Sequence, residues 1–313
     1  MVARNRTNCW QLQTKNLTKK YGDFTALDRV SVSLKKKHIY GFIGGNGAGK
    51  STFMKIITGL SCQTEGDYSL LGKEREPERE KMRKYIGSMI EAPALYPNYS
   101  VFRNLELQRI LVGNPDKTVC DKVLDMVGLT EMKKKKVSTL SMGMKQRLGI
   151  AKALVGNPQL LILDEPVNGL DPQNIVALRT LLKNLSEEKE VTIFISSHIL
   201  NELYLLATDY IFIHKGKIIE ELTHEQLEEK CRQYICIKAD NVPKAVTVLD
   251  KMYENPKYKV ISDNTIHLYS NASDMETISK AFMQNNIVIT ELSVKEQSLE
   301  DYYISITGGA DYV

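Results

Sequence analysis

The stretch Gly44-Gly45-Asn46-Gly47-Ala48-Gly49-Lys50-Ser51-Thr52 fits the complete pattern G-x-x-x-x-G-K-[ST] of a phosphate-binding loop. Such a loop needs glycines because its backbone N–H groups curl around phosphate oxygens, and a Cβ at those turns would block the close approach. Lys50 adds a positive charge that reaches the β- and γ-phosphates, and the Ser51 hydroxyl is suited to ligate Mg²⁺. The sequence therefore predicts a nucleotide-binding site here.

The residues on either side of this stretch predict a strand before it and a helix after it. Residues 38–43 form a short apolar run, which suits a buried strand. Residues 50–60 carry apolar side chains at helical spacing, and the N-terminus of that helix would face the same anion. The alternative is a glycine turn that only connects the strand to the helix, and the rarity of the full pattern argues against it.

A second stretch, Leu160-Leu161-Ile162-Leu163-Asp164-Glu165, is an apolar run that ends in two carboxylates. A short run without alternation predicts a strand buried on both faces of a parallel sheet. The carboxylates would then lie at the carboxyl end of the strand, which is the edge where α/β sheets bind ligands. Asp164 is placed to hold Mg²⁺, directly or through water, and Glu165 to orient and polarise the attacking water. The alternative is a plain strand end.

Between these stretches, the segment Leu140-Ser141-Met142-Gly143-Met144-Lys145-Gln146-Arg147 resembles the signature motif of ABC-type ATPases, whose usual form is LSGGQ followed by x-Q-R. The resemblance extends to Tyr21, which matches the aromatic that stacks on adenine, to Leu170-Asp171, which is similar to the D-loop, and to Ser196-Ser197-His198, which is similar to the H-loop after an expected strand at 191–195. The order of these motifs over residues 12–225 makes the resemblance specific. Read alone, Ser141 and Gly143 also fit an ordinary helix cap.

The resemblance implies an α/β fold with the P-loop NTPase core of an ABC ATPase, in which a parallel sheet is joined by antiparallel strands and a helical subdomain. We expect a nucleotide-binding domain at residues 1–228, with its helical subdomain at about 92–155, and a small C-terminal α+β domain at 229–313. ATP and Mg²⁺ would be the ligands. The run of lysines at residues 133–136 is expected to be a solvated turn before the signature helix.

The resemblance also implies a second nucleotide-binding subunit. In the family, the signature serine and its neighbouring N–H groups face the γ-phosphate held by the phosphate loop of another subunit. Ser141 and Gly143 would play this part, Asp171 would lie at the subunit interface, and His198 would contact the γ-phosphate. Because this chain has one phosphate loop and one signature, we expect it to pair with a second copy or with a close relative.

Two positions depart from the family pattern. Met142 and Met144 stand where LSGGQ has glycine and glutamine, while Ser141 and Gly143 keep the groups that touch phosphate. In the segment 86–97, Glu91 occupies the position of the usual Q-loop glutamine. An ionised glutamate only accepts hydrogen bonds and adds a negative charge near the Mg²⁺ site, so it would raise metal affinity or slow the chemistry. The alternative is a surface glutamate in a similar loop.

Glu91 and the run E-x-P-x-x-Y-P that it opens are similar to the lantibiotic-immunity and bacitracin-resistance branch of the ABC ATPases. That branch implies a separately encoded transmembrane permease, a peripheral position on the cytoplasmic face of the cell membrane, and export of an antimicrobial peptide or a lipid-linked antibiotic. The helical subdomain, including an expected helix at 104–111, would dock a cytoplasmic helix of the permease. Two other functions stay open: a slow ATPase in an antibiotic-sensing complex, and a non-transporting ATP switch.

The last third of the chain carries none of these motifs. Its pattern predicts the order β-α-β-β-α-β, typical of a small split βαβ domain, with strands at 234–239, 258–261, 265–269 and 287–292 and helices at 242–253 and 275–285. A short last helix would begin after Ser298, with Glu300 and Asp301 in its first turn. A packing or dimer-contact role and a cargo-linked regulatory role both stay open.

Composition adds few constraints. An apolar share of 42% and a charged share of 26% are ordinary for a globular chain. A net charge of +4 argues neither for nor against a nucleic-acid partner, and we expect none. The basic side chains of residues 1–20 are too sparse for a nucleic-acid arm and predict a solvated leader. We expect no signal peptide and no bilayer-spanning segment. The five scattered cysteines show no metal-ligand spacing and are expected to be reduced.

Overall fold

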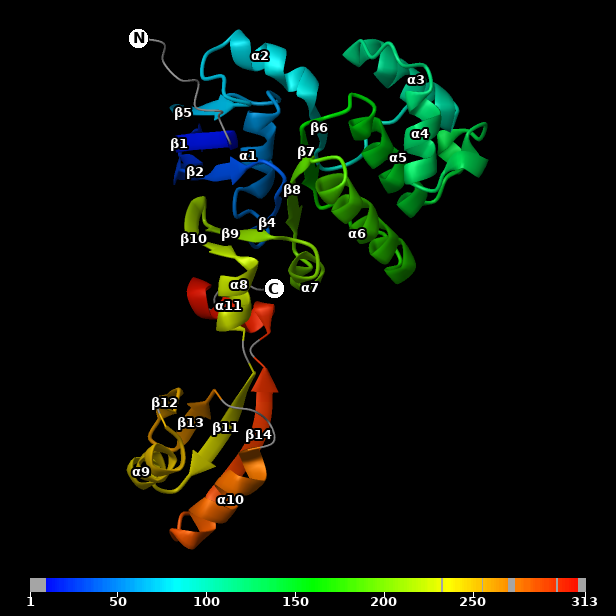
Figure 1. Ribbon diagram of the computed structural model, residues 1–313. Coiled ribbons are helices and arrows are strands. Elements are labelled where there is room, and N and C mark those ends of the chain that lie inside the picture. Colours follow the sequence, from blue (N-terminus) through cyan, green and yellow to red (C-terminus); the bar gives the residue numbers. More distant parts are fainter. Residues whose placement is uncertain (1–9, 232, 255, 270–273, 297, 309–313) are drawn as a thin grey trace, which may run out of the picture. The chain divides into compact units, whose positions relative to one another are not determined.

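The computed structural model describes residues 10–231, 233–254, 256–269, 274–296 and 298–308 (Figure 1). They fall into two compact units, the first ending at His224 and the second beginning at Glu225. The boundary expected at residue 228 lies inside a helix, α8 (His224–Lys230). None of the helices among these residues combines the length and the apolar character that a bilayer crossing requires.

The described residues of the first unit form two sheets and the helices that pack beside them. Its strands are β1 (Trp10–Tyr21), β2 (Phe24–Val30), β3 (Ser33–Lys35), β4 (Ile39–Ile43), β5 (Glu65–Leu70), β6 (Ile86–Met89), β7 (Leu160–Asp164), β8 (Thr192–Ser197), β9 (Asp209–His214) and β10 (Lys217–Thr223). Its helices are α1 (Lys50–Ile57), α2 (Glu78–Met82), α3 (Val101–Val112), α4 (Val119–Met126), α5 (Met142–Leu154), α6 (Pro172–Glu187) and α7 (Leu200–Tyr204).

The larger sheet has the strand order β10-β9-β4-β8-β7-β6. All its neighbouring pairs are parallel except the edge pair of β9 and β10. Every residue of β4, β7 and β8 is buried, as expected for strands covered on both faces. The predicted α/β fold with a parallel sheet and antiparallel strands is confirmed. The strands expected at 38–43, 160–164 and 191–195 are β4, β7 and β8, with small shifts at their ends.

The smaller sheet is antiparallel and contains β1, β2, β3 and β5. Residues 1–9 of the expected solvated leader lie outside the described residues, and the expectation is wrong for residues 10–20, which form most of β1. Leu12 and Leu17 are fully buried in this strand, whereas Lys15 and Lys20 point to solvent. The leucines are five residues apart, and Asn16, with φ of 50°, accompanies an irregular register that brings both leucines to the core side.

The core of the first unit lies around α1, between the two sheets (Figure 1). Phe42 of β4, Phe53 of α1 and Phe194 of β8 form an aromatic cluster with ring centroids 5.0–5.7 Å apart. These contacts fix α1, the helix that follows the phosphate-binding loop, against the parallel sheet. They hold the helix in the orientation that binding of an anion at its N-terminus requires.

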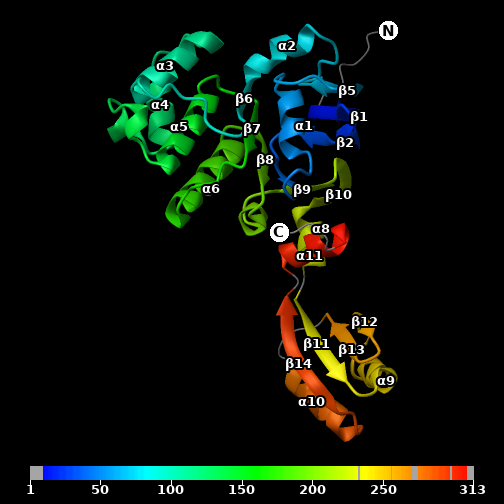
Figure 2. The ribbon, with the colours of Figure 1, turned by 180° about the vertical axis from the view of Figure 1, so that it is seen from behind.

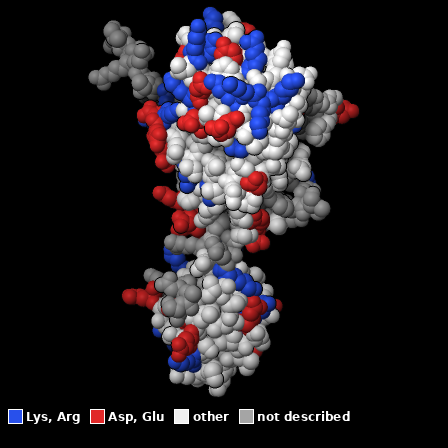
Figure 3. Space-filling view, turned by 90° about the vertical axis from the view of Figure 1, so that its right-hand side faces the viewer, with Lys and Arg blue, Asp and Glu red and all other residues white. Residues whose placement is uncertain are grey.

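Helices α3, α4 and α5 pack together beside β6 and β7, away from the antiparallel sheet (Figure 2). The helix expected at 104–111 is α3, which starts earlier because Ser100 caps it by accepting a hydrogen bond from the N–H of Arg103. Residues 133–136 form a turn, in which Lys133 pairs with Asp121. Lys and Arg side chains on this side of the first unit lie among Asp and Glu side chains (Figure 3).

The second unit has the predicted order β-α-β-β-α-β. Its elements are β11 (Gln233–Ala239), α9 (Val242–Met252), β12 (Tyr258–Ser262), β13 (Thr265–Leu268), α10 (Met275–Gln284) and β14 (Ile289–Glu296). The antiparallel sheet has the order β12-β13-β11-β14 and packs α9 and α10 around a core of its own. The last helix, α11 (Leu299–Thr307), starts at the predicted cap, where Ser298 and Asp301 form a capping box.

Candidate nucleotide-binding site

Four neighbouring strands of the parallel sheet carry the site at their carboxyl ends. In the order of the sheet, β4 leads into the phosphate-binding loop, β8 into His198, β7 into Glu165 and β6 towards Glu91. The register aligns Asp164 with Ser196 and Met89 with Leu163. Segments far apart in the chain therefore meet along one edge of the sheet, where α/β proteins bind ligands.

The backbone of the phosphate-binding loop is held against two other strands. Gly49 has φ of 109°, and a Cβ there would lie 2.6 Å from the carbonyl oxygen of Ala26 in β2. A Cβ on Gly44 would lie 2.6 Å from the carbonyl oxygen of Ile213 in β9. Only glycine fits at these positions, and the loop keeps the tight curl that a phosphate cradle needs. The N-cap residue of α1 is Gly49, which has no side chain to cap the helix, so the site can satisfy its N–H groups with an anion.

Lys50 is buried at the base of the loop, with 7% of its side chain exposed. Its Nζ donates to the carbonyl oxygens of Gly44, at 2.6 Å, and Gly45, at 3.2 Å. The nearest carboxylate oxygen, Oε1 of Glu165, is 3.6 Å away. A buried ammonium that is held mainly by neutral carbonyls suits a site that receives a polyanion.

Asp164 and Ser51 supply oxygen ligands suited to Mg²⁺. Asp164 is 1% exposed, and its Oδ1 accepts a hydrogen bond of 2.6 Å from the Ser196 hydroxyl. Ser51 occupies the first turn of α1. A carboxylate and a hydroxyl are hard oxygen donors, and Mg²⁺ is commonly bound by one or two carboxylates together with the phosphates of its substrate. The residues present therefore fit the metal that the sequence predicts.

Glu165 is held on several sides and lies at the centre of the site. Its Oε2 accepts a 3.1 Å hydrogen bond from the His198 backbone N–H and lies 2.7 Å from the His198 Nδ1. Its own N–H donates to the Ser196 hydroxyl at 3.0 Å. Gln146 of α5 donates to the Glu165 carbonyl oxygen at 3.4 Å. With φ of 50°, Glu165 also adopts a backbone conformation that non-glycine residues rarely show.

Sequence reasoning did not single out Ser196 or Gln146 as support for the two carboxylates. Both lie inside the quoted motifs, and their hydrogen bonds to Asp164 and Glu165 depend on how β7, β8 and α5 pack. The only signal in the sequence is their place in the family pattern. Their contacts link the expected H-loop and signature helix to the carboxylate strand.

The other predicted residues lie at the surface of the first unit. Tyr21 is half exposed at the end of β1, with the Lys19 ammonium 4.8 Å from its ring centroid. Ser141 is the N-cap of α5 and accepts a 3.3 Å hydrogen bond from the Met144 N–H, so it is a helix cap as well as a signature residue. Gly143 follows in the first turn of α5. Asp171 caps α6, and hydrogen bonds from Asn174 lower the pKa of its carboxyl.

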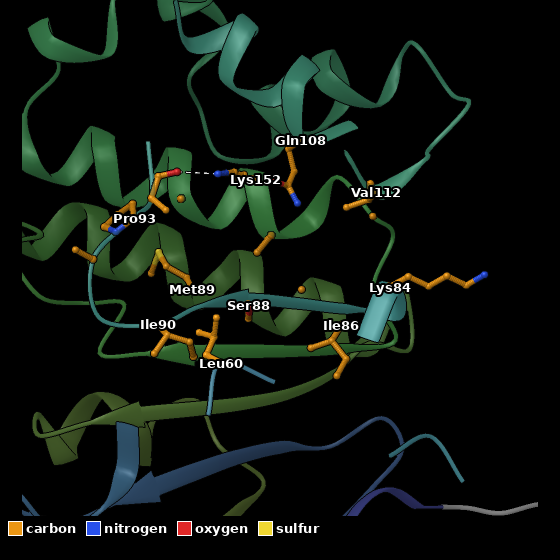
Figure 4. Close-up of a pocket in the computed structure, with 16 residues that line it drawn as sticks. Leu60, Lys84, Ile86, Ser88, Met89, Ile90, Pro93, Gln108, Val112 and Lys152 are labelled. Atoms are coloured by element: carbon orange, nitrogen blue, oxygen red, sulfur yellow. Dashed lines mark hydrogen bonds between the residues drawn. The ribbon is translucent and has the colours of Figure 1, made fainter. Parts of the chain in front are cut away.

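A cavity of about 300 Å³ lies between β6, α3 and α5, next to the Glu91 segment (Figure 4). Its lining residues are mostly apolar and include Met89, Pro93 and Val112, while its polar side chains are those of Lys84, Ser88, Gln108 and Lys152. The Lys152 ammonium donates to the carbonyl oxygen of Ala94 at 2.7 Å, and burial lowers its pKa. The cavity therefore combines an apolar wall with the partly desolvated ammonium of Lys152.

The family model of the ABC transporter matches residues 27–168. The bacitracin transport ATP-binding protein of Bacillus licheniformis is 39% identical over 298 residues, which are 95% of this chain and 97% of that protein. This chain belongs to the ABC transporter ATP-binding family. It is an ABC-type ATPase, as the resemblance predicted. A lantibiotic transport ATP-binding protein of Streptococcus pyogenes is 47% identical over 221 residues, 70% of this chain and 94% of its own length.

Solved structures of ABC cassettes align with about two thirds of this ABC ATPase. The dimeric cassette MJ0796, in a post-hydrolysis state bound to ADP and Pi, aligns with a TM-score of 0.63 at 28% identity and covers 68% of this chain and 98% of its own. The CbiO1 protein of Clostridium perfringens, part of an ABC transporter complex, aligns with a TM-score of 0.63 at 26% identity, over 71% of this chain and 92% of its own.

The clash that a Cβ would make at Gly49 has a measurable consequence. We expect Gly49→Ala to lower the free energy of unfolding by about 2–4 kcal/mol, because it adds a collision with the Ala26 carbonyl to a strained backbone. Gly113 has a similar left-handed φ of 69° but open space around it, so Gly113→Ala should cost only about 1–2 kcal/mol. Urea unfolding of both variants measures the difference, and equal losses would contradict the steric argument.

Proposed function

We propose that this ABC ATPase works as a pair of nucleotide-binding subunits and drives a separately encoded membrane permease, which exports a peptide antibiotic. The observation that carries the proposal is the meeting of Lys50, Asp164, Glu165 and His198 at adjacent strand ends, within one network of short contacts. This arrangement supports hydrolysis of a nucleoside triphosphate, and the relatives support its use in transport.

Each residue of the site has a proposed role. The loop Gly44–Thr52 and Lys50 bind the phosphates of ATP, while Tyr21 stacks on the adenine. Glu165 accepts a proton from the attacking water, and its contacts with His198 hold it in place for this step. His198 contacts the γ-phosphate. Mg²⁺, when bound by Ser51 and Asp164, would neutralise phosphate charge during transfer.

We propose that a second copy of this chain completes the site. Ser141, Gly143 and Asp171 lie on the surface of the first unit, where another subunit can reach them. A helix N-terminus such as that of α5 is suited to receive a phosphate from a partner. The dimeric state of the MJ0796 cassette supports this assembly.

The permease would dock a cytoplasmic helix at the cavity between β6, α3 and α5. Its apolar wall suits the apolar face of a helix, and its position places the docked helix beside the Glu91 segment. The protein would then sit at the cytoplasmic face of the membrane. The names of the bacitracin and lantibiotic transport relatives support an antimicrobial peptide or a lipid-linked antibiotic as the cargo.

Purification from the native cell tests this function. We expect a tagged chain, recovered from gently solubilised membranes, to bring down a multi-span membrane protein in stoichiometric amount. Leu60 is exposed at the cavity, so Leu60→Glu should reduce this recovery, whereas Leu205→Glu, at an exposed leucine outside the cavity lining, should not. Recovery of the wild-type chain alone, or with ribosomes or DNA, would overturn the transporter proposal in favour of an ATP switch.

Glu91 favours a second candidate function, a slow ATPase in an antibiotic-sensing complex. A carboxylate at the position of the Q-loop glutamine can accept hydrogen bonds but cannot donate them, and the loss of the amide donor would slow turnover. ATP turnover of the assembled complex, with and without a candidate peptide, separates the two functions. An exporter should move the peptide across the membrane as it hydrolyses ATP, whereas a sensor should change its turnover without moving the peptide.

A further inference from the structure

Lys55 is a cation close to the nucleotide site. None of the roles proposed above involves this residue. It lies on α1, five residues after Lys50, and its Nζ is 2.5 Å from Oε1 of Glu91. Glu91 is the residue that replaces the usual glutamine of the family. The glutamate that departs from the family pattern therefore forms an ion pair with a lysine on α1, the helix that follows the phosphate-binding loop.

The surroundings of Lys55 place it within electrostatic reach of the site. The hydrogen bond to Glu91 is the largest cause that raises the pKa of Lys55, and electrostatic interactions with Glu91, Tyr21 and Asp164 add to it. Tyr21 is the proposed adenine contact, and Asp164 is the proposed metal ligand. A charge at Lys55 or at Glu91 would accordingly act on a nucleotide bound between these groups.

The backbone at Glu91 directs its side chain away from the cavity. Ile90 and Ala92, on either side of it, line the cavity between β6 and α5, whereas Glu91 contacts α1. Glu91 has φ of 61°, a conformation that non-glycine residues rarely adopt. Observed strain of this kind is common at functional sites, where the surrounding contacts maintain it.

The charges of Glu91 and Lys55 indicate what the contact between them does. An ionised carboxylate near a triphosphate repels it, and a glutamine at the same position would carry no charge. An ammonium at 2.5 Å cancels most of the field of the carboxylate at longer distances. We infer that Lys55 is a positioning residue, which holds the Glu91 carboxylate against α1 and offsets its charge at the ATP site. The inference rests on the proposed function of that site.

A charge-compensation experiment on the full chain tests this. The affinity for a fluorescent ATP analogue is measured by equilibrium titration in EDTA and again with Mg²⁺, so the readout does not depend on turnover. Because this variant leaves one carboxylate uncompensated near a polyanion, we expect Lys55→Gln to raise Kd about tenfold in EDTA. Glu91→Gln leaves the Lys55 ammonium unbalanced and should lower Kd, and the double variant should return to within about threefold of wild type.

Two further variants complete the design. Lys122 pairs with Asp116 at 2.9 Å on the far part of the helical region, so Lys122→Gln removes the same charge and should leave Kd unchanged. Lys55→Arg keeps the ion pair and should retain the affinity. Because Glu91 is 62% exposed and Lys55 is 34% exposed, the pair adds little to stability, and we expect all variants to fold.

The outcomes separate the inference from the proposed function. If wild type binds the analogue and Lys55→Gln binds it equally well, the inference fails and the ATP site stands. If the double variant binds as weakly as Lys55→Gln, Lys55 contacts the phosphates itself and the inference also fails. If wild type does not bind the analogue, the proposed function fails. The expected loss and its rescue by Glu91→Gln would support the inference.

Discussion

Replacement of Glu165 by glutamine is expected to lower ATP turnover by about 10²–10⁴-fold while ATP binding persists. Glutamine has nearly the same shape and can still accept the hydrogen bond from the His198 N–H, so the strand end should keep its geometry. What the variant loses is the carboxylate that can take a proton from water. Phosphate release at saturating ATP, together with nucleotide affinity, measures the two effects separately.

Glu190 offers a control for this substitution. It is an exposed glutamate before β8, at the opposite end of the strand from His198, and it pairs with Lys37 at 2.5 Å. Glu190→Gln removes the same charge far from the phosphate-binding loop and should leave turnover unchanged. Wild-type turnover in Glu165→Gln would show that another group takes the proton and would remove Glu165 from the proposed mechanism.

The second large effect is expected at Lys50. We expect Lys50→Ala to weaken ATP binding by about 30- to 1000-fold, since hydrogen bonds to a charged group contribute about 1.5–3 kcal/mol each. The variant also leaves the carbonyls of Gly44 and Gly45 without the donor they have in the native loop. Equilibrium titration with a fluorescent ATP analogue and Mg²⁺ measures the loss.

Lys152 is a matched control for Lys50. It is also a partly buried lysine whose ammonium donates to a backbone carbonyl, that of Ala94 at 2.7 Å, but it lines the cavity between β6, α3 and α5. Lys152→Ala should leave ATP affinity near that of wild type. A similar loss in both variants would mean that the effect comes from disturbed packing and not from a phosphate contact.

The parts of the site that could be predicted are those written in short, local patterns. The phosphate-binding loop needs its glycines and lysine at fixed spacing, and the strand before Asp164 needs a continuous apolar run, so both are visible in the sequence. The contact of Lys55 with Glu91 was not predicted, because it depends on how α1 packs beside the end of β6. The hydrogen bond from Gln146 to Glu165 depends in the same way on the packing of α5.

The wrong prediction of a solvated leader at residues 10–20 has a similar cause. The first twenty residues carry five basic side chains and no acidic one, and the spacing of Leu12 and Leu17 does not fit a regular alternation. The irregular pairing of β1 with its neighbours, together with the left-handed backbone at Asn16, brings both leucines into the core. That irregularity is a property of the paired strands and is not encoded in a short sequence window.

The strand order of the parallel sheet also determines when the site can form during synthesis. Strand β8 lies between β4 and β7 and joins the phosphate-binding loop to the carboxylate strand, yet it is made only at residues 192–197. A nascent chain of 180 residues therefore carries both motifs without the strand that connects them. Domains generally fold as units during translation. Binding of ATP can therefore stabilise the nucleotide-binding unit only after the chain up to His198 has left the ribosome. Cellular nucleotide would thus act on a late step of folding and not on the early ones.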